Sequence, residues 1–170
     1  MEILIVMEKS KVADVMLDRR KHVEGIPVVR ETTFRGLPLK VEIDRGMTAS
    51  GIDPDGVPWK VTYENPYGSI VGSVGRDGDE VDFYLGDNID SDLVCIIHQV
   101  HKDGSYDEQK ICLGFDSMLD ALECFFKHGA RWAFGSMESM LFPTFVNGYL
   151  TATRAIAEKR IPAVHFVAGE

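Results

Sequence analysis

Asp77-Gly78-Asp79-Glu80-Val81-Asp82, running directly into Phe83-Tyr84-Leu85, is the most informative stretch of this chain. It places three aspartates within six positions, just ahead of an apolar strand pattern. Side chains in a strand alternate between faces, so these carboxylates can converge only across a tight turn, which Gly78 permits. Hard oxygen ligands at this density suit Mg²⁺ or Ca²⁺ rather than zinc. The alternative is a plain acidic hairpin turn, because Asp-Gly is a common turn dipeptide.

The chain from Glu24 to Leu113 consists of short runs rich in Val, Ile, Tyr and Phe, separated by glycines. This texture predicts a small antiparallel sheet or barrel. The clearest strands are expected at Leu39–Ile43, Trp59–Tyr63, Val81–Leu85, Leu93–Val100 and Lys110–Phe115.

Two helices are expected after the strands. Asp116-Ser117 opens a helix over Met118–Lys127, and Gly129 follows as a stop signal. Its apolar side should carry Leu119, Leu122, Phe125 and Phe126. A second helix is expected from about Pro143 to Lys159, because proline is tolerated in a first turn, although Gly148 weakens the pattern. Residues Ile161–Val167 could return as a strand.

The N-terminal segment differs in texture from the strands. A short apolar start is followed by Ser10-Lys-Val12-Ala-Asp-Val15-Met16-Leu-Asp-Arg-Arg20, in which Ser10 could cap a helix. This predicts an arm or an oligomer contact over residues 1–23. Residues 24–135 should then form the single compact domain with its closing helix, and residues 136–170 a C-terminal helix and tail. The predicted class is α+β, mainly β.

The composition argues against several classes of partner and site. The formal charge is −9, with 27 acidic against 18 basic residues, which argues against a nucleic-acid or membrane partner. The chain has no long uncharged apolar run, and its start is acidic, so a cytoplasmic protein is expected. Cys95, Cys112 and Cys124 lie in apolar runs without zinc spacing and should be buried free thiols.

Tyr67-Gly-Ser-Ile70 followed by the Asp77–Asp82 run resembles the signature of soluble family I inorganic pyrophosphatases, in which Tyr-Gly-Tyr-Ile precedes Asp-Gly-Asp-Pro-Val-Asp by the same offset. From about Phe34 to His128 the chain is also similar to pyrophosphatase-like domains of phage and mobile-element polyvalent proteins. The resemblance implies a small OB-like β-barrel of about five strands flanked by one or two helices. It also suggests a homo-oligomer, virion-associated if phage-encoded.

The resemblance assigns roles to the acidic run and to a later segment. It makes Asp77 and Asp82 metal ligands, and Asp79 a ligand or the group that orients the attacking water. The family also has two aspartates five positions apart and a lysine two beyond the second. Here that spacing is reproduced by Asp103, Glu108 and Lys110, with Asp107 as a competing ligand.

Upstream residues also match. Lys40-Val-Glu42 looks like the family's Lys-x-Glu, in which the lysine meets phosphate and the acid faces the metals, and Tyr67 would donate to phosphate. The alternative for Lys40 and Glu42 is a solvated strand face with a cross-strand ion pair.

The chain also departs from the family pattern. A Tyr-Lys pair that grips phosphate is replaced by Gly129 and Ala130, with substitutes nearby at Lys127, His128 and Arg131. Ser69 replaces an aromatic residue.

Two functions follow from these features. The first is hydrolysis of pyrophosphate or another small phosphoanhydride with Mg²⁺, or alternatively Mn²⁺, activating the attacking water. Lys40, Tyr67 and Lys110 would stabilise the leaving phosphate, and Glu42 would join the metal ligands. The second is a degenerate, non-catalytic pyrophosphatase-like protein with a structural or injected role in a phage.

Overall fold

The computed structural model of the chain describes the backbone of residues 2–6, 15–18 and 28–157, and the side chains of residues 28–154. Most of the strands form one seven-stranded sheet, in the order β11-β9-β10-β8-β7-β4-β3. The members in chain order are β3 (Arg30–Phe34), β4 (Leu37–Ile43), β7 (Tyr67–Ile70), β8 (Asp82–Leu85), β9 (Leu93–Val100), β10 (Tyr106–Leu113) and β11 (Phe134–Leu141). Only β8 and β10 pair in parallel; the other neighbours in this sheet are antiparallel.

The central strands of this sheet are buried on both faces. In β9, Val94 and Ile96 belong to one apolar cluster, while Cys95 and Ile97 belong to another. The period of two that separates these side chains explains why the strand reads as a continuous apolar run. Each face therefore needs its own cover.

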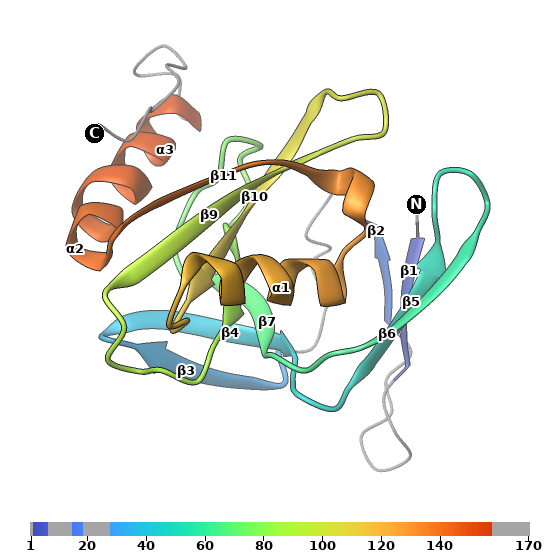
Figure 1. Cartoon of the computed structure of the whole chain (residues 1–170), viewed down its shortest axis with the longest axis horizontal. Helices are drawn as coiled ribbons and strands as arrows, with labels where there is room; N and C mark the ends of the chain where they lie inside the picture. The colour runs from blue at the N-terminus through green and yellow to red at the C-terminus, as the bar shows by residue number, and fades with distance from the viewer. Residues whose placement is uncertain (1, 7–14, 19–27, 158–170) are drawn as a thin grey trace.

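One face is covered by α1 (Met118–His128), which lies across the sheet in Figure 1. Ser117 caps the helix by accepting the Asp120 N–H, and Gly129 ends it, as the sequence predicted. The buried residues recur at helical spacing: Ala121, Cys124, Phe125 and His128. The prediction that Leu119 lies on the apolar side of this helix is wrong. Leu119 lies two positions before the buried Ala121 and so faces solvent, with 63% of its surface exposed.

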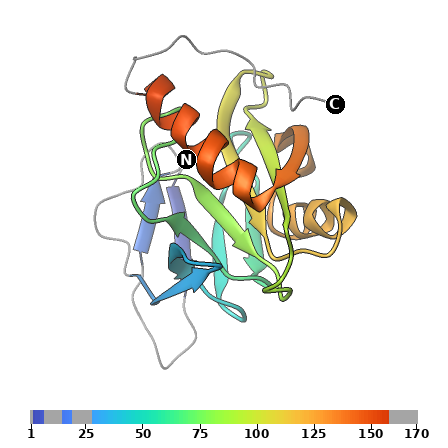
Figure 2. The same cartoon turned by 90° about the vertical axis from the view of Figure 1, so that its left-hand side faces the viewer.

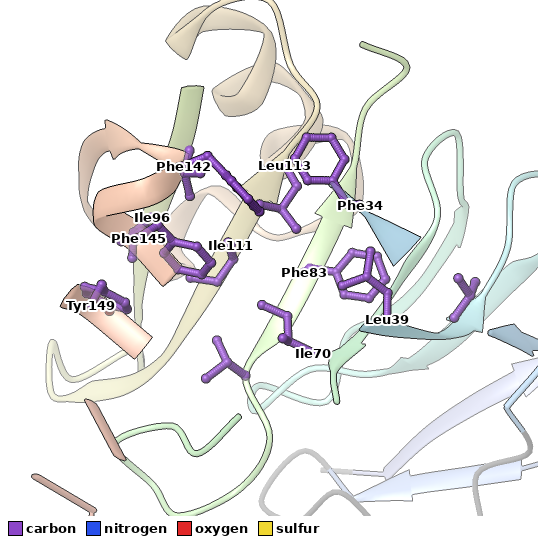
Figure 3. Close-up of a cluster of buried hydrophobic side chains, with 13 residues drawn as sticks. Phe34, Leu39, Ile70, Phe83, Ile96, Ile111, Leu113, Phe142, Phe145 and Tyr149 are labelled. Atoms are coloured by element: carbon purple, nitrogen blue, oxygen red, sulfur yellow. The ribbon is translucent and has the colours of Figure 1, made fainter. Parts of the chain in front are cut away.

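The opposite face is covered by the C-terminal helical run, which Figure 2 brings to the front. It comprises α2 (Phe142–Thr144), the π-turn η2 (Phe145–Tyr149) and α3 (Leu150–Ala157). Phe142, Phe145 and Tyr149 pack onto the strands, as Figure 3 shows. The predicted helix is confirmed, with Pro143 in its first turn and Gly148 inside the π-turn. The strand expected at 161–167 lies outside the described residues.

A smaller sheet of four strands stands beside the large one, in the order β2-β1-β5-β6 (Figure 1). Its strands are β1 (Glu2–Val6), β2 (Val15–Asp18), β5 (Thr48–Ile52) and β6 (Pro58–Thr62). β2 corrects the expected N-terminal helix, because these residues pair with β1 in the register Glu2↔Asp18. The run Ile3–Val6 offers a strand partner, and such tertiary pairing overrides a weak helical pattern.

The class is confirmed as α+β, mainly β, but the barrel is a correction. The described strands number eleven, in two sheets, and the larger sheet is open, with β11 and β3 as its edges. The three cysteines are buried free thiols, as predicted. Among the described residues, no helix has both the length and the apolar character needed to span a bilayer.

Candidate functional site

A row of polar side chains runs across the face of the large sheet that α1 covers. The strand register aligns Lys40 of β4 with Ser69 of β7, Ser69 with Asp82 of β8, and Asp82 with Lys110 of β10. Cross-strand neighbours in register share a face. The sequence-predicted residues Lys40, Asp82 and Lys110, far apart in the chain, are therefore brought into one line.

Lys110 lies at the centre of the predicted site residues. Its side chain is only 7% exposed, and its Nζ is 2.5 Å from Asp82 Oδ2 and 2.7 Å from Glu108 Oε1. It also donates to the Tyr67 hydroxyl at 2.7 Å, and that hydroxyl donates in turn to Asp82. The three ammonium protons thus have three acceptors, which is what burial of a charge demands.

The cluster holds two carboxylates against one ammonium. Burial raises the pKa of Glu108 to about 7, with the Asp82 charge adding to the rise and the Lys110 charge opposing it. Burial disfavours the Lys110 ammonium, yet Asp82 and Glu108 hold its pKa well above the ordinary value. The site thus combines a fixed cation with a carboxyl group able to exchange a proton near neutral pH, the property of a general acid or base.

Asp77 and Asp79 lie in the loop that leads into β8. A Gly75 N–H bond to the Asp79 carbonyl (2.6 Å) and a Gly78 N–H bond to the Gly75 carbonyl (3.0 Å) tighten this loop. Gly78 has φ +94°, the left-handed conformation expected of its turn. Partial burial raises the pKa of Asp77, and the charges of Asp79 and Asp82 add to the rise. The charges of Asp79 and Asp82 therefore act on the Asp77 carboxyl group.

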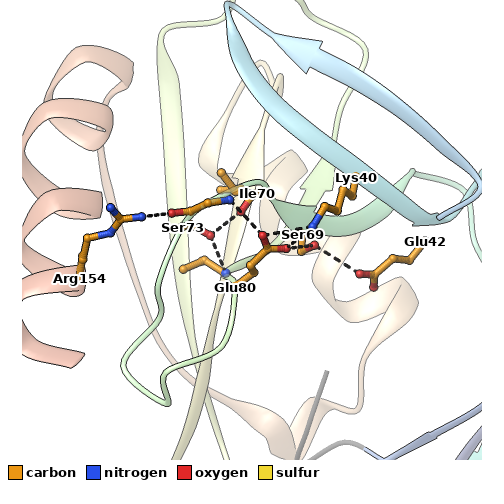
Figure 4. A network of polar contacts seen from close by, with 9 residues as sticks. Lys40, Glu42, Ser69, Ile70, Ser73, Glu80 and Arg154 are labelled. Atoms are coloured by element: carbon orange, nitrogen blue, oxygen red, sulfur yellow. Dashed lines mark hydrogen bonds and ion pairs between the residues drawn. The ribbon is translucent and has the colours of Figure 1, made fainter. Parts of the chain in front are cut away.

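Glu80 is a site residue that sequence reasoning missed. Its carboxylate accepts from Lys40 Nζ at 3.2 and 3.3 Å and from Ser69 Oγ at 2.9 Å (Figure 4). The available signal was its position, since Glu80 stands where the family signature has proline. Lys40 does form an ion pair, but its partner comes from the loop rather than from the neighbouring strand.

Glu42 is buried, with 9% of its surface exposed, and lies near this network. Ser69 Oγ is 3.3 Å from its Oε1, so a single hydroxyl contacts both Glu42 and Glu80 (Figure 4). Ser69 therefore links the buried Glu42 to the Glu80–Lys40 pair.

Asp103 and Asp107 lie apart from the Lys110 contacts. Asp103 is exposed in the β9–β10 hairpin, and its Oδ1 accepts from the Ser105 N–H at 2.8 Å. Asp107 accepts from Gln99 Nε2 at 2.8 Å and lies 3.6 Å from His101 Nε2. Of the residues proposed for this part of the site, Glu108 is the one that contacts Lys110.

The expected substitutes for the phosphate-gripping pair are engaged elsewhere. His128 stacks between Tyr63 and Tyr84, accepts the Glu64 N–H at Nε2 (2.9 Å), and has Nδ1 2.7 Å from the Cys124 carbonyl. Burial lowers its pKa. These contacts fit a neutral ring that donates at Nδ1.

The two neighbouring cations are also occupied. Lys127 pairs with Glu64 at 2.8 Å, and the Arg131 guanidinium lies 4.9 Å from the centre of the Phe126 ring. All three substitutes thus make structural contacts at the end of α1.

The donor set suits a hard cation, since the predicted ligands are carboxylates and Asp82 and Glu108 exceed their ammonium by one charge. Within residues 28–154, however, no three His, Cys, Asp or Glu side chains converge on one point as a metal site would require. Lys110 itself takes the position between Asp82 and Glu108.

Comparison with known proteins supports the resemblance noted in the sequence. The family model described as Inorganic Pyrophosphatase matches residues 21–147, which include every predicted site residue. Searches of curated proteins and of solved structures gave no match. The match covers most of the chain, and the chain therefore belongs to the inorganic pyrophosphatase family.

Proposed function

We propose that the protein hydrolyses pyrophosphate or a related small phosphoanhydride at the face that carries Lys110. The observation that carries the proposal is the buried contact of Lys110 with Asp82, Glu108 and Tyr67, in a chain of the pyrophosphatase family. A packing scaffold gains nothing from burying two carboxylates and a lysine together, because their desolvation offsets their attraction.

Each residue of the cluster has a chemical task in this proposal. Lys110 and the Tyr67 hydroxyl stabilise negative charge that develops on a phosphate oxygen, in a site where burial strengthens the interaction. Glu108, with a pKa of about 7, gives or takes a proton. Asp77 and Asp82 would hold Mg²⁺, and Asp79 would orient or deprotonate the attacking water. These carboxylates would have to draw together around the ion, because within residues 28–154 no three acidic side chains converge on one point. Bound Mg²⁺ would supply neutralisation of the phosphates and a more acidic water.

A phosphate-release assay with Mg²⁺ or Mn²⁺ tests this function, using pyrophosphate, short polyphosphates and nucleoside triphosphates as substrates. We expect metal-dependent release from at least pyrophosphate. A Lys110→Met variant, with its folded fraction measured in parallel, is the matched negative control. Absence of release from every substrate by the folded wild-type protein would contradict the proposal.

The second candidate, a non-catalytic member of the family, is favoured by one observation. Of the residues available in place of the missing Tyr-Lys pair, His128 is buried as a neutral ring, Lys127 pairs with Glu64, and Arg131 lies over the Phe126 ring. A protein of this kind would have a structural or injected role and would not hydrolyse phosphoanhydrides. Direct binding measurements beside the release assay separate the two functions.

A further inference from the structure

The Glu80 carboxylate is held by donors from three separate segments. Lys40 Nζ of β4 lies 3.3 Å from Oε1 and 3.2 Å from Oε2. Ser69 Oγ of β7 donates to Oε2 at 2.9 Å, and the Gly72 N–H of the following turn donates to Oε1 at 3.0 Å. An ammonium, a hydroxyl and a backbone N–H thus converge on both oxygens of one anion, which is the composition of a phosphate-binding site.

This arrangement is anchored from the outside. Gly72 has φ +72°, and Arg154 of α3 donates to its carbonyl (Figure 4). Ser73 Oγ donates to the Ile70 carbonyl at 2.6 Å and accepts the Val81 N–H at 2.8 Å, which ties the two ends of the loop together. The Gly72 N–H is therefore held in place by contacts that do not involve Glu80.

The contact between Lys40 and Glu80 is partly open to solvent. The Lys40 and Glu80 side chains remain 33% and 28% exposed, so an anion from solution can reach them.

We propose that Lys40, Ser69 and the Gly72 N–H form a phosphate subsite that Glu80 occupies in the free protein as an internal competitor. A phosphate group that binds here must displace the Glu80 carboxylate. The inference rests on the proposed function only for the identity of the ligand, a phosphate group. The donors satisfied by Glu80 are ones that a tetrahedral oxyanion can also satisfy.

The test is a Glu80→Gln variant, which keeps an acceptor oxygen for Ser69 and Gly72 but removes the competing charge. Binding of inorganic phosphate and of pyrophosphate is measured by calorimetry without divalent metal. If Glu80 occupies the subsite in about nine molecules of ten, and the neutral amide, which lacks the attraction to Lys40, leaves it open, both ligands should bind the variant about tenfold more tightly. A gain for pyrophosphate alone would assign the subsite to a phosphate of the substrate rather than to free phosphate.

Two further variants sharpen the experiment. Adding Lys40→Met to Glu80→Gln should abolish the gain, since the ammonium supplies the attraction. Glu123→Gln, at an exposed position on α1, makes the same change in net charge and should leave both affinities unchanged. A folded Glu80→Gln variant that binds neither ligand more tightly than wild type would overturn the proposal.

Failure of this inference is distinguishable from failure of the proposed function. Tighter binding in Glu80→Gln without any hydrolysis by the wild-type protein would support the subsite and contradict catalysis. Hydrolysis by the wild-type protein without tighter binding in Glu80→Gln would support catalysis and contradict the subsite. If Glu80→Gln does not fold, the subsite is tested in the wild-type protein by the NMR amide resonance of Gly72. It should shift saturably on titration with phosphate, and an unchanged resonance at saturating phosphate counts against the subsite.

Discussion

Lys110 and Asp82 lie opposite each other in the one parallel strand pair of the large sheet, with Nζ 2.5 Å from Oδ2. A parallel pair has no tight turn between its strands, so 27 residues separate these two side chains in sequence. The ion pair is buried, so removing either side chain leaves the other as an uncompensated buried charge. This dependence gives the first prediction.

Lys110→Met should destabilise the fold strongly, because Asp82 and Glu108 would then be buried without a cation. Breaking a buried ion pair from one side typically costs about 3–5 kcal/mol. Urea unfolding at neutral pH measures the loss. Adding Glu108→Gln to this variant should restore part of the stability by removing one of the stranded charges. A loss below about 1 kcal/mol would show that the site is more hydrated than the structure indicates.

Glu108 predicts a pH dependence of stability. Its pKa of about 7 in the folded state lies above the ordinary value of 4.5, which applies to the unfolded chain. Between pH 4.5 and about 7, the folded state therefore binds more protons at Glu108 than the unfolded state does. The free energy of unfolding should therefore fall as pH rises from about 4.5 to about 7, with a slope of at most about 1.4 kcal/mol per pH unit. Comparing wild type with Glu108→Gln over this range isolates the effect. Glu123→Gln is the control, and a Glu108→Gln curve parallel to wild type would contradict the prediction.

A side chain at Gly68 should clash with the neighbouring strand beside the site. A Cβ at this position would stand 1.9 Å from the Lys40 carbonyl oxygen, so β4 and β7 could not keep their spacing. Gly68→Ala should cost at least about 1–3 kcal/mol, the usual range for overpacking. Gly148→Ala is the matched control, because a Cβ there meets nothing within 4 Å. The control should be neutral or stabilising by up to about 1 kcal/mol, the gain of alanine over glycine in a helix. Thermal unfolding of both variants gives the comparison.

The parts of the fold that were predictable follow from local patterns. The strand at Leu93–Val100 was recognisable because it is buried on both faces, and α1 because Ser117 and Gly129 mark its ends. β2 was not recognisable, since four residues with mixed pattern become a strand only by pairing with β1. Openness of the sheet likewise depends on which strands find partners, and no local pattern encodes that.

The site was predictable only in part, for a similar reason. The family spacing placed Asp82, Glu108 and Lys110 in the predicted site. The register of β8 and β10 brings Asp82 and Lys110 into contact, and Glu108 also contacts Lys110. The pairing of Glu80 with Lys40 depends on the path of the loop from Val71 to Val81, which the sequence pattern does not specify. Equally, nothing in the sequence shows that His128 is enclosed by Tyr63 and Tyr84.

The final prediction separates the roles proposed for Asp79 and Asp82. Asp79→Asn, if Asp79 orients or deprotonates water, should lower turnover by about 10²–10⁴-fold while leaving stabilisation by Mg²⁺ nearly intact. Asp82→Asn removes a charged metal ligand, so its lost activity should partly return as Mg²⁺ is raised.

The structure adds a second expectation, because Asp82 is also the partner of buried Lys110, whereas Asp79 is half-buried in a loop. Asp82→Asn should therefore lower the unfolding free energy without metal, and Asp79→Asn should not. Steady-state kinetics at several Mg²⁺ concentrations, paired with metal-free urea unfolding, read both effects. If both variants hydrolyse pyrophosphate at the wild-type rate, the run from Asp77 to Asp82 is an acidic turn, because a carboxylate that binds metal or water cannot become an amide without consequence.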